Sequence, residues 1–296
     1  MKNKRITILG SGGQIGAYLT EYLRKNEEYE VREFDITNGE DQDMRTIPNP
    51  ELHRTIMTSD FVFFLAFDVG GSRYLKKYQH TFDFVNNNAR LMVNVFGLLE
   101  KYKVPFVFAS SQMSNMSHSP YGTLKRVGEL YTQTLKGLTV KFWNVYGIEH
   151  DAEKSHVITD FIRRGFEEGK FEMLTDGTEE RQFLYAEDCC EALETIMECY
   201  SDFKPTDPLH VTSFNSHSIK YVADTIQGQF NLLGSDLDDP KYYDIKITPG
   251  LAKDSVQMDK RNEADSYILD WWSPKTGLHE GIAKVFEEMK KEYIND

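Results

Sequence analysis

A glycine-rich turn near the start of the chain constrains the fold more than any other feature. An apolar run at residues 5–9 leads into Gly-Ser-Gly-Gly-Gln-Ile-Gly at residues 10–16, and a stretch with helical periodicity follows to residue 25. Glycines at this spacing let the backbone approach a pyrophosphate, and the start of the following helix supplies N–H donors and a positive dipole end. The turn predicts a β–α unit that binds a dinucleotide, with contacts from Gly10, Gly13, Gln14, Ile15 and Gly16.

The next predicted strand, residues 29–34, is followed by Asp35. A carboxylate at this position would accept hydrogen bonds from both adenosine ribose hydroxyls and would repel a 2'-phosphate. Arg32 precedes the end of the strand and is poorly placed to bind such a phosphate. The sequence therefore predicts NAD rather than NADP as the cofactor. The alternative is that Asp35 only caps a turn in Asp-Ile-Thr-Asn-Gly.

Apolar runs that suit buried strands alternate with helical periodicity through the first half of the chain. Strands are predicted over residues 61–67, 104–109 and 138–144, and helices over 83–102 and 121–136. The run Phe-Val-Phe-Phe-Leu-Ala-Phe is apolar throughout, as expected of a strand that is covered on both faces. This alternation predicts an α/β fold with a doubly wound parallel Rossmann sheet.

After Gly147 the predicted strands are shorter, and helices are expected over residues 156–168, 186–200, 219–230 and 278–293. We therefore predict two parts. An NAD-binding Rossmann domain occupies residues 1–147, and a smaller C-terminal α/β substrate lobe occupies residues 148–296, with some crossing of the chain between them.

Composition and charge exclude several classes of protein. The net charge of -13 argues against non-specific binding of nucleic acid, which needs a basic surface. No apolar run approaches the length of a membrane span, and the apolar stretch near the start is too short for a signal peptide, so a cytoplasmic protein is expected. The cysteines and histidines lack metal-ligand spacing, so no metal site is predicted.

A second motif, Tyr121-x-x-x-Lys125, indicates what is done with the dinucleotide. Residues four positions apart lie on the same face of a helix. An ammonium beside a phenol favours the phenolate, so we expect Lys125 to lower the pKa of Tyr121. Such a tyrosine can move the proton of a substrate hydroxyl while a nicotinamide takes up hydride. The spacing alone is common, and its weight comes from the glycine-rich turn upstream.

These motifs, with others along the whole chain, resemble the extended short-chain dehydrogenases/reductases of the nucleotide-sugar epimerase/dehydratase group. Phe-Leu-Ala-Phe at residues 64–67 resembles the family's strand end His-Leu-Ala-Ala beside the cofactor. Phe-Ala-Ser-Ser at residues 108–111 resembles the strand end that carries the active-site Ser or Thr, which implies Ser111, with Ser110 as its competitor. The resemblance implies that Tyr121 and Lys125 are the catalytic pair and that further cofactor contacts come from Leu65, Ala66, Phe67 and Asn88.

Later segments resemble the sugar-nucleotide lobe of the same family. Trp-Asn-Val-Tyr-Gly at residues 143–147 resembles a segment whose asparagine touches substrate, which implies that role for Asn144. Arg-Gln-Phe-Leu-Tyr at residues 181–185 resembles a segment whose arginine binds the substrate diphosphate, which implies that role for Arg181. The alternatives are that Asn144 only ends a strand and that Arg181 pairs with a neighbouring glutamate on the surface.

The resemblance implies NAD-dependent oxidation at C4 of a nucleoside-diphosphate sugar, by a 4-dehydrogenase or a 4-epimerase, with a hexose or heptose for surface polysaccharide as the substrate class. Gln112 and Met113 stand where the family's dehydratases carry an Asp-Glu pair, and the connection from Ser111 to Tyr121 is short. A non-catalytic NAD-sensing relative is the alternative. A homodimer is also expected, through apolar residues of the helices at 83–102 and 121–136: Leu91, Val95, Leu98, Leu124, Val127 and Leu130.

Overall fold

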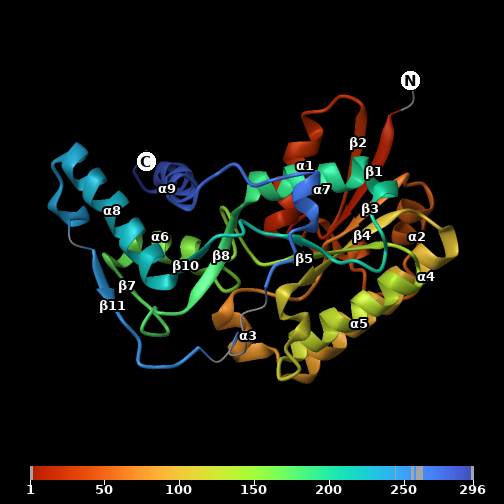
Figure 1. Ribbon diagram of the computed structural model, residues 1–296, viewed down its shortest axis with the longest axis horizontal. Coiled ribbons are helices and arrows are strands. Elements are labelled where there is room, and N and C mark those ends of the chain that lie inside the picture. Colours follow the sequence, from red (N-terminus) through yellow and green to blue (C-terminus); the bar gives the residue numbers. More distant parts are fainter. Residues whose placement is uncertain (1–2, 244, 255–256, 258–262, 295–296) are drawn as a thin grey trace.

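The computed structural model describes residues 3–243, 245–254, 257 and 263–294 of the 296-residue chain. Figure 1 shows two parts side by side. The larger part holds the N-terminus and is built on a central sheet. The smaller lobe contains the helices α6 (Val157–Glu168), α8 (Ile219–Leu237) and α9 (Leu278–Ile294).

A parallel sheet forms the centre of the larger part, as predicted, and in the described residues it has six strands. In spatial order its strands are β2 (Tyr29–Phe34), β1 (Lys4–Leu9), β3 (Phe61–Phe64), β4 (Phe106–Ser111), β5 (Leu138–Phe142) and β9 (Leu209–Val211). Leu9, the last residue of β1, pairs with Phe34 on one side and with Phe64 on the other. The strand order reverses at β1, so a ligand crevice is expected at the carboxyl ends of β1 and β3.

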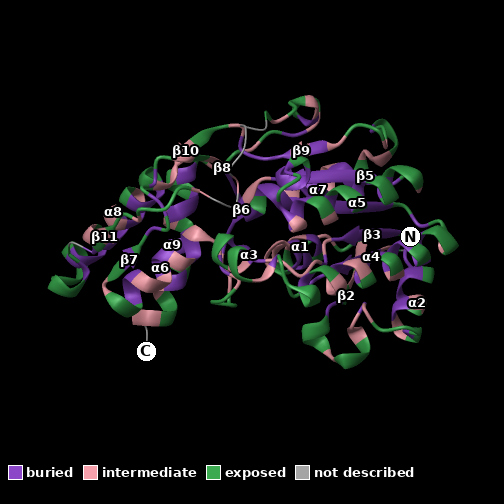
Figure 2. Ribbon diagram, turned by 90° about the horizontal axis from the view of Figure 1, so that it is seen from below, coloured by how far each residue is buried: buried purple, intermediate pink, exposed green. Residues whose placement is uncertain are grey.

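Alternate residues of β1, β3 and β4 enter two separate cores. Ile8 and Phe63 pack on one face of the sheet, with α1 (Gln14–Arg24) and α7 (Ala186–Glu198). Phe64 and Phe108 pack on the other face, which is covered by α2 (Pro50–Met57), α4 (Phe82–Tyr102) and α5 (Pro120–Thr134). Figure 2 shows the strands buried and the outer sides of the helices exposed. Both faces are covered, which explains why β3, Phe-Val-Phe-Phe, is apolar throughout.

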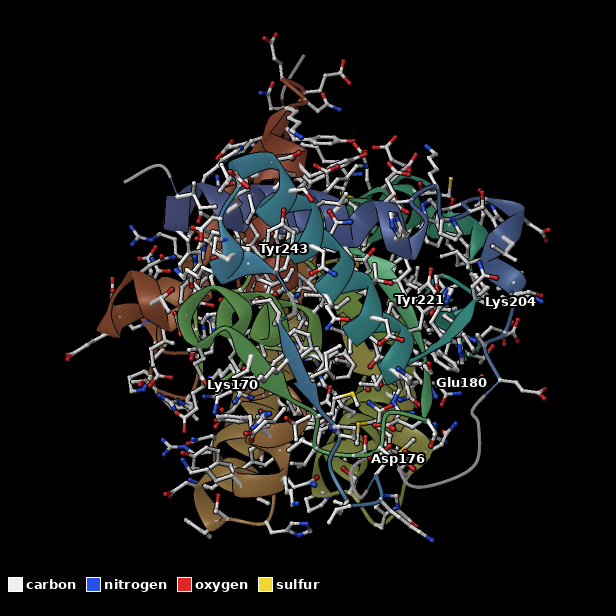
Figure 3. The ribbon with its side chains drawn as sticks, turned by 90° about the vertical axis from the view of Figure 1, so that its left-hand side faces the viewer. Lys170, Asp176, Glu180, Lys204, Tyr221 and Tyr243 are labelled. Atoms are coloured by element: carbon white, nitrogen blue, oxygen red, sulfur yellow. The ribbon has the colours of Figure 1, made fainter. Side chains whose placement is uncertain are left out.

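The smaller lobe contains two short sheets. One has the order β10 (Ser216–Ser218), β8 (Glu180–Tyr185), β6 (Asn144–Tyr146), and the other pairs β7 (Lys170–Glu172) with β11 (Lys246–Thr248). Phe166, Phe230 and Phe286, from α6, α8 and α9, meet in the core of the lobe. Figure 3 views the lobe from its outer end, where labelled residues of β7, β8 and α8 are exposed: Lys170, Glu180 and Tyr221.

The chain passes between the two parts more than once. β9 lies between β8 and β10 in the sequence, but it pairs with β5 at the edge of the large sheet. The apolar run at residues 138–144, predicted as one strand, forms two. β5 ends at Phe142 in the large sheet, and β6 begins at Asn144 in the smaller one. Trp143 is therefore the residue at which the chain changes sheets.

Two helices occur where none was predicted. α2 follows the predicted loop at residues 38–50; Asn49 caps it by accepting from the Leu52 N–H, and Pro50 occupies its first turn. α3 (Ser72–Tyr78) lies between β3 and α4. The remaining helical elements are short 3-10 turns: η1 (Ile36–Asn38), η2 (Glu40–Gln42), η3 (Gln112–Asn115), η4 (Tyr200–Asp202), η5 (Pro240–Tyr242) and η6 (Tyr267–Asp270). No helix in the described residues is long and apolar enough to cross a membrane.

Half of the residues expected at a dimer interface are inside the molecule. Leu91, Val95 and Leu98 on α4 are at most 8% exposed and belong to the chain's own core. Helix periodicity alone did not reveal this, because α4 contacts the sheet and α2 over a broad face. Val127 and Leu130 on α5 are exposed.

Candidate active site

A cavity of about 860 Å³ opens at the carboxyl ends of the central strands. A second cavity, of about 170 Å³, lies between the large sheet and the smaller lobe. Among the described residues, seven line both cavities and so mark their junction: Val69, Gly70, Ser111, Tyr121, Trp143, Val145 and His156. Two of the three expected catalytic residues are thus at the junction itself.

The glycine-rich turn forms one end of the larger cavity. Gly10 has φ +93°, and a Cβ there would lie 2.5 Å from the backbone nitrogen of Ala66. A Cβ on Gly16 would overlap the carbonyl oxygen of Gly10, so the turn packs closely against itself and against the end of β3. Gly10, Gly13, Gln14, Ile15 and Gly16 all line the cavity.

The start of α1 is suited to an anionic ligand. Its N-cap, Gly13, makes no side-chain cap hydrogen bond, and Gln14, Ile15 and Gly16 in the first turn line the cavity. The side-chain nitrogen of Gln14 is buried and has no hydrogen-bond partner among the described residues. An orphaned donor, uncapped N–H groups and a cavity of this size fit the pyrophosphate of a dinucleotide.

Asp35 is held with its carboxylate at the wall of this cavity. It is 9% exposed, and one oxygen accepts from the Gly12 N–H at 3.1 Å. The other oxygen accepts from the N–H and the hydroxyl of Thr37, each at 2.9 Å. Arg32 instead contacts Glu30 and Thr58 and does not line the cavity. The position fits an acceptor for ribose hydroxyls, because carboxylate oxygens have further lone pairs.

The end of β3 forms the opposite wall of the cavity. Leu65, Ala66 and Phe67 line it. Asn88 does not line either cavity. It is fully buried, where its side chain accepts from the Asp68 N–H at 2.7 Å and donates to the Asp68 carbonyl at 3.1 Å. Asn88 thus fixes the backbone at Asp68, directly after the cavity wall formed by Leu65, Ala66 and Phe67.

Tyr121, Lys125 and Ser111 come together where α5 meets the end of β4. The Lys125 ammonium donates to the carbonyl of Ala109 at 2.6 Å and lies 3.8 Å from the centre of the Phe67 ring. Its distance to the centre of the Tyr121 ring is 5.8 Å. The hydroxyls of Tyr121 and Ser111 share a hydrogen bond that favours the phenolate. The helical spacing has therefore placed both residues of the motif on the face that covers β4.

The pKa values of this pair differ from the expectation. Burial raises the pKa of Tyr121 to about 12, and the hydrogen bond with Ser111 offsets only part of this rise. Burial lowers the pKa of Lys125 to about 7, against the opposing charge of Glu129. The prediction that Lys125 lowers the pKa of Tyr121 is wrong for this structure, because desolvation dominates and the ammonium is turned toward Ala109 and Phe67.

Ser110, the competitor of Ser111, has another partner. Its hydroxyl donates to the Glu129 carboxylate at 2.6 Å, within the protein. The Ser111 oxygen accepts from the Met113 N–H at 3.1 Å and lies at the junction of the cavities. Ser111 is therefore the serine that is placed toward a ligand beside Tyr121.

The smaller lobe contributes Asn144 and Arg181 to the second cavity. The Asn144 amide donates to the Gln182 carbonyl at 3.3 Å. Arg181 forms an ion pair with Asp254, and it also donates to the Glu180 carbonyl at 2.7 Å. Asp254 lines the same cavity. The guanidinium thus faces the cavity with a carboxylate already bound to it.

Other site residues were not predicted from the sequence. Trp143 lines both cavities, and its neighbour Asn144 in the same motif was the signal that could have found it. His156 precedes α6 and contacts Glu149 at 2.7 Å. Asp254 has no local signal, since its place depends on the pairing of β7 with β11. Within the described ranges, no group of three His, Cys, Asp or Glu residues could hold a metal ion.

The sequence is similar to a known protein family and to two characterised enzymes. Residues 6–211 match the model of the NAD dependent epimerase/dehydratase family. A GDP-L-fucose synthase of Sinorhizobium fredii is 28% identical over 151 residues, which are 49% of this chain and 44% of that protein. The UDP-glucuronic acid decarboxylase 1 of Arabidopsis thaliana is 22% identical over an alignment that covers 100% of this chain and 72% of that protein. The chain thus spans less than half of the first of these relatives.

The fold has close counterparts among solved structures. A GDP-6-OMe-4-keto-L-xylo-heptose reductase from C. jejuni superposes with a TM-score of 0.80 at 17% identity. The match covers 99% of this chain and 99% of the other. At this identity the similarity shows that the two chains share a fold.

Proposed function

The chain belongs to the NAD-dependent epimerase/dehydratase family and uses NAD, and on that premise we propose that it is an enzyme acting at C4 of a nucleoside-diphosphate sugar. One observation carries the proposal. Ser111 and Tyr121 lie where a cavity fitted to a dinucleotide meets a second cavity that contains Arg181. A sugar held at this junction would have its reacting carbon beside the Tyr121 hydroxyl and its diphosphate toward Arg181.

The glycine-rich turn, Asp35 and the end of β3 would hold NAD. When bound, NAD would act as the two-electron oxidant by accepting a hydride. Tyr121 exchanges a proton with the C4 oxygen, and Ser111 hydrogen-bonds both that oxygen and the phenol. Lys125, with a pKa of about 7, can take up or release a proton near neutral pH within the same buried site. If the 4-keto sugar is released, the enzyme is a 4-dehydrogenase. If the 4-keto sugar is instead reduced again on its opposite face, the enzyme is a 4-epimerase.

A second candidate is the reduction of a 4-keto sugar, which is the same step run in reverse. The burial of Tyr121 favours it: burial raises the pKa of the phenol to about 12, so that at neutral pH the phenol is an acid that can protonate a ketone oxygen. Oxidation needs the phenolate, which is rare at that pH. We therefore expect oxidation to speed up as the pH rises and reduction to depend on it less.

The substrate class is proposed as a hexose or heptose joined to a nucleoside diphosphate. Its support is the pair of named relatives, whose names contain a GDP-linked and a UDP-linked sugar, together with an arginine in the second cavity. A planar guanidinium binds diphosphate oxygens through two hydrogen bonds at once. Synthesis of a surface polysaccharide is the proposed use of the product.

The test is direct. The protein is incubated with NAD or NADH and a panel of UDP-, GDP- and dTDP-sugars, with their 4-keto forms where available, and products are measured by mass after borodeuteride trapping. Tyr121→Phe should reduce turnover by at least ~10²-fold without changing NAD affinity. Tyr131→Phe, on the same helix, is the control. NAD binding without turnover of any sugar nucleotide would favour a non-catalytic NAD-sensing protein.

A further inference from the structure

Trp143 is placed to contact whatever lies at the junction of the two cavities. It is partly exposed, lines both cavities, and stands between the last residue of β5 and the first residue of β6. Ser111 and Tyr121 line the same junction. A substrate ring that reacts beside the Tyr121 hydroxyl must therefore lie close to Trp143.

The polar edge of the indole is engaged by the protein. Its Nε1 donates to Nδ1 of His210 on β9 at 3.3 Å, and the two ring centres are 6.1 Å apart at an interplanar angle of 50°. The indole nitrogen is the polar atom of this side chain. With that atom turned toward β9, the indole offers apolar aromatic surface to the cavities.

His210 is suited to hold the indole in a fixed position. Burial and the positive charge of Lys141 lower the pKa of His210 to about 4, so the ring is neutral and Nδ1 can accept. Lys141 lies opposite His210 in the pairing of β5 with β9, and its ammonium is 3.3 Å from the Glu129 carboxylate. Trp143 is thus anchored to the central sheet, and little entropy is lost when a ligand packs on it.

The next inference rests on the proposed function. We infer that Trp143 is a specificity-determining residue whose indole packs against the apolar C–H face of the substrate's sugar ring. The negative face of an indole attracts C–H groups, and it replaces only weakly the hydrogen bonds to water that a hydroxyl pointing at it would lose. Sugars with hydroxyls directed away from Trp143 should bind more tightly than epimers with a hydroxyl directed toward it. His210 acts as a positioning residue for this contact.

The other two tryptophans provide the contrast. Trp272 is 4% exposed, and Trp271 packs on Phe203 with ring centres 4.7 Å apart. Neither lines the two cavities. A change in tryptophan fluorescence caused by a sugar should therefore come from Trp143.

The experiment compares each bare nucleoside diphosphate with its sugar-linked form. Calorimetry measures the affinities of UDP and UDP-glucose, and of GDP and GDP-mannose, for the wild type, Trp143→Ala, Trp143→Phe and the control Trp271→Phe. In Trp143→Ala we expect the sugar-linked ligands to lose about 10-fold in affinity and the bare diphosphates to change little. Trp143→Phe should keep most of the affinity, because it keeps an aromatic face. If Trp143→Ala does not fold, Trp143→Leu replaces it, since leucine is apolar and lacks the ring.

A second pair of variants tests the anchor. His210→Phe removes the acceptor and should lower the preference for the sugar-linked ligand, whereas His210→Asn keeps a side-chain oxygen that can accept from the indole and should restore it. Quenching of fluorescence by the sugar-linked ligand should disappear in Trp143→Phe and persist in Trp271→Phe. Equal losses for sugar-linked and bare ligands, or no loss, would overturn the inference while leaving the proposed function intact. Failure of the wild type to bind any of the four ligands or any dTDP-sugar would overturn both.

Discussion

The carboxylate of Glu129 accepts a 2.6 Å hydrogen bond from the hydroxyl of Ser110. This contact is the third of a series. Tyr121, Lys125 and Glu129 follow one another at intervals of four on α5, and they contact Ser111, the Ala109 carbonyl and Ser110 at the end of β4. One face of one helix is therefore fastened to three successive residues of one strand. This line of contacts fixes the position of Tyr121 and Lys125 relative to Ser111 in the candidate site.

Glu129 should be important for stability because it balances a buried cation. Its carboxylate lies 3.3 Å from the Lys141 ammonium, and both residues are at most 5% exposed. Glu129→Gln should lower the free energy of unfolding by about 3 kcal/mol, since it leaves Lys141 without its counterion. The double variant Glu129→Gln/Lys141→Met should recover most of the loss in urea denaturation. Equal losses in the single and double variants would show that the pair is not coupled.

Lys125 should make stability rise with pH above neutrality. Its pKa is about 7 in the folded chain, against an ordinary value of 10.5, so between these values the unfolded chain binds more protons. The free energy of unfolding then increases with pH, by at most about 1.4 kcal/mol per unit from this group. Urea denaturation of wild type and Lys125→Met between pH 7 and 8.5 measures the difference. Parallel curves would contradict the lowered pKa.

Asp35 should set the choice between NAD and NADP. Asp35→Asn removes the charge and keeps an oxygen for the Gly12 N–H. We expect the preference for NADH over NADPH to fall about 10-fold, because repulsion of the 2'-phosphate is relieved. Fluorescence titration of both cofactors measures it. Asp41→Asn is the control, since Asp41 is exposed and does not line the cavity. An unchanged preference would mean that Asp35 does not discriminate.

Asp254 should compete with an anionic ligand for Arg181, because the two residues form an ion pair inside the second cavity. With NAD present to fill the first cavity, Asp254→Asn should raise the affinity for UDP or GDP about 10-fold, and Arg181→Gln should lower it by a similar factor. Asp224→Asn, which breaks a surface ion pair with Lys220, is the control. Weaker binding in Asp254→Asn would show instead that Asp254 orients Arg181 for the ligand.

The exposed apolar side chains of α4 and α5 should pair with a second copy of the chain. Val93 on α4 is 55% exposed and Leu130 on α5 is 51% exposed, and the two helices are neighbours. We expect a homodimer by light scattering, and Leu130→Glu should convert it to a monomer. Leu237→Glu, at an exposed position on α8, should leave the dimer intact. A wild-type monomer at micromolar concentration would refute the proposal.

The sequence by itself determined the features that depend on local spacing. The glycines of residues 10–16 predicted a dinucleotide turn because only a residue without a side chain permits those close approaches, and the structure places all of them at the cavity. The interval of four between Tyr121 and Lys125 put both on one helix face, since an α-helix repeats every 3.6 residues. The alternation of apolar strands and helices was enough to predict the parallel sheet, because its strands are covered on both faces.

Tertiary structure alone decided the features that depend on segments far apart in the chain. The pKa of Tyr121 rose because other segments exclude water from it, and no local pattern measures that desolvation. Asp254 reaches Arg181, and His210 reaches Trp143, only after β11 joins β7 and β9 returns to the large sheet. Spacing along the chain specifies which face a side chain occupies, whereas packing between distant segments specifies its partner and its charge.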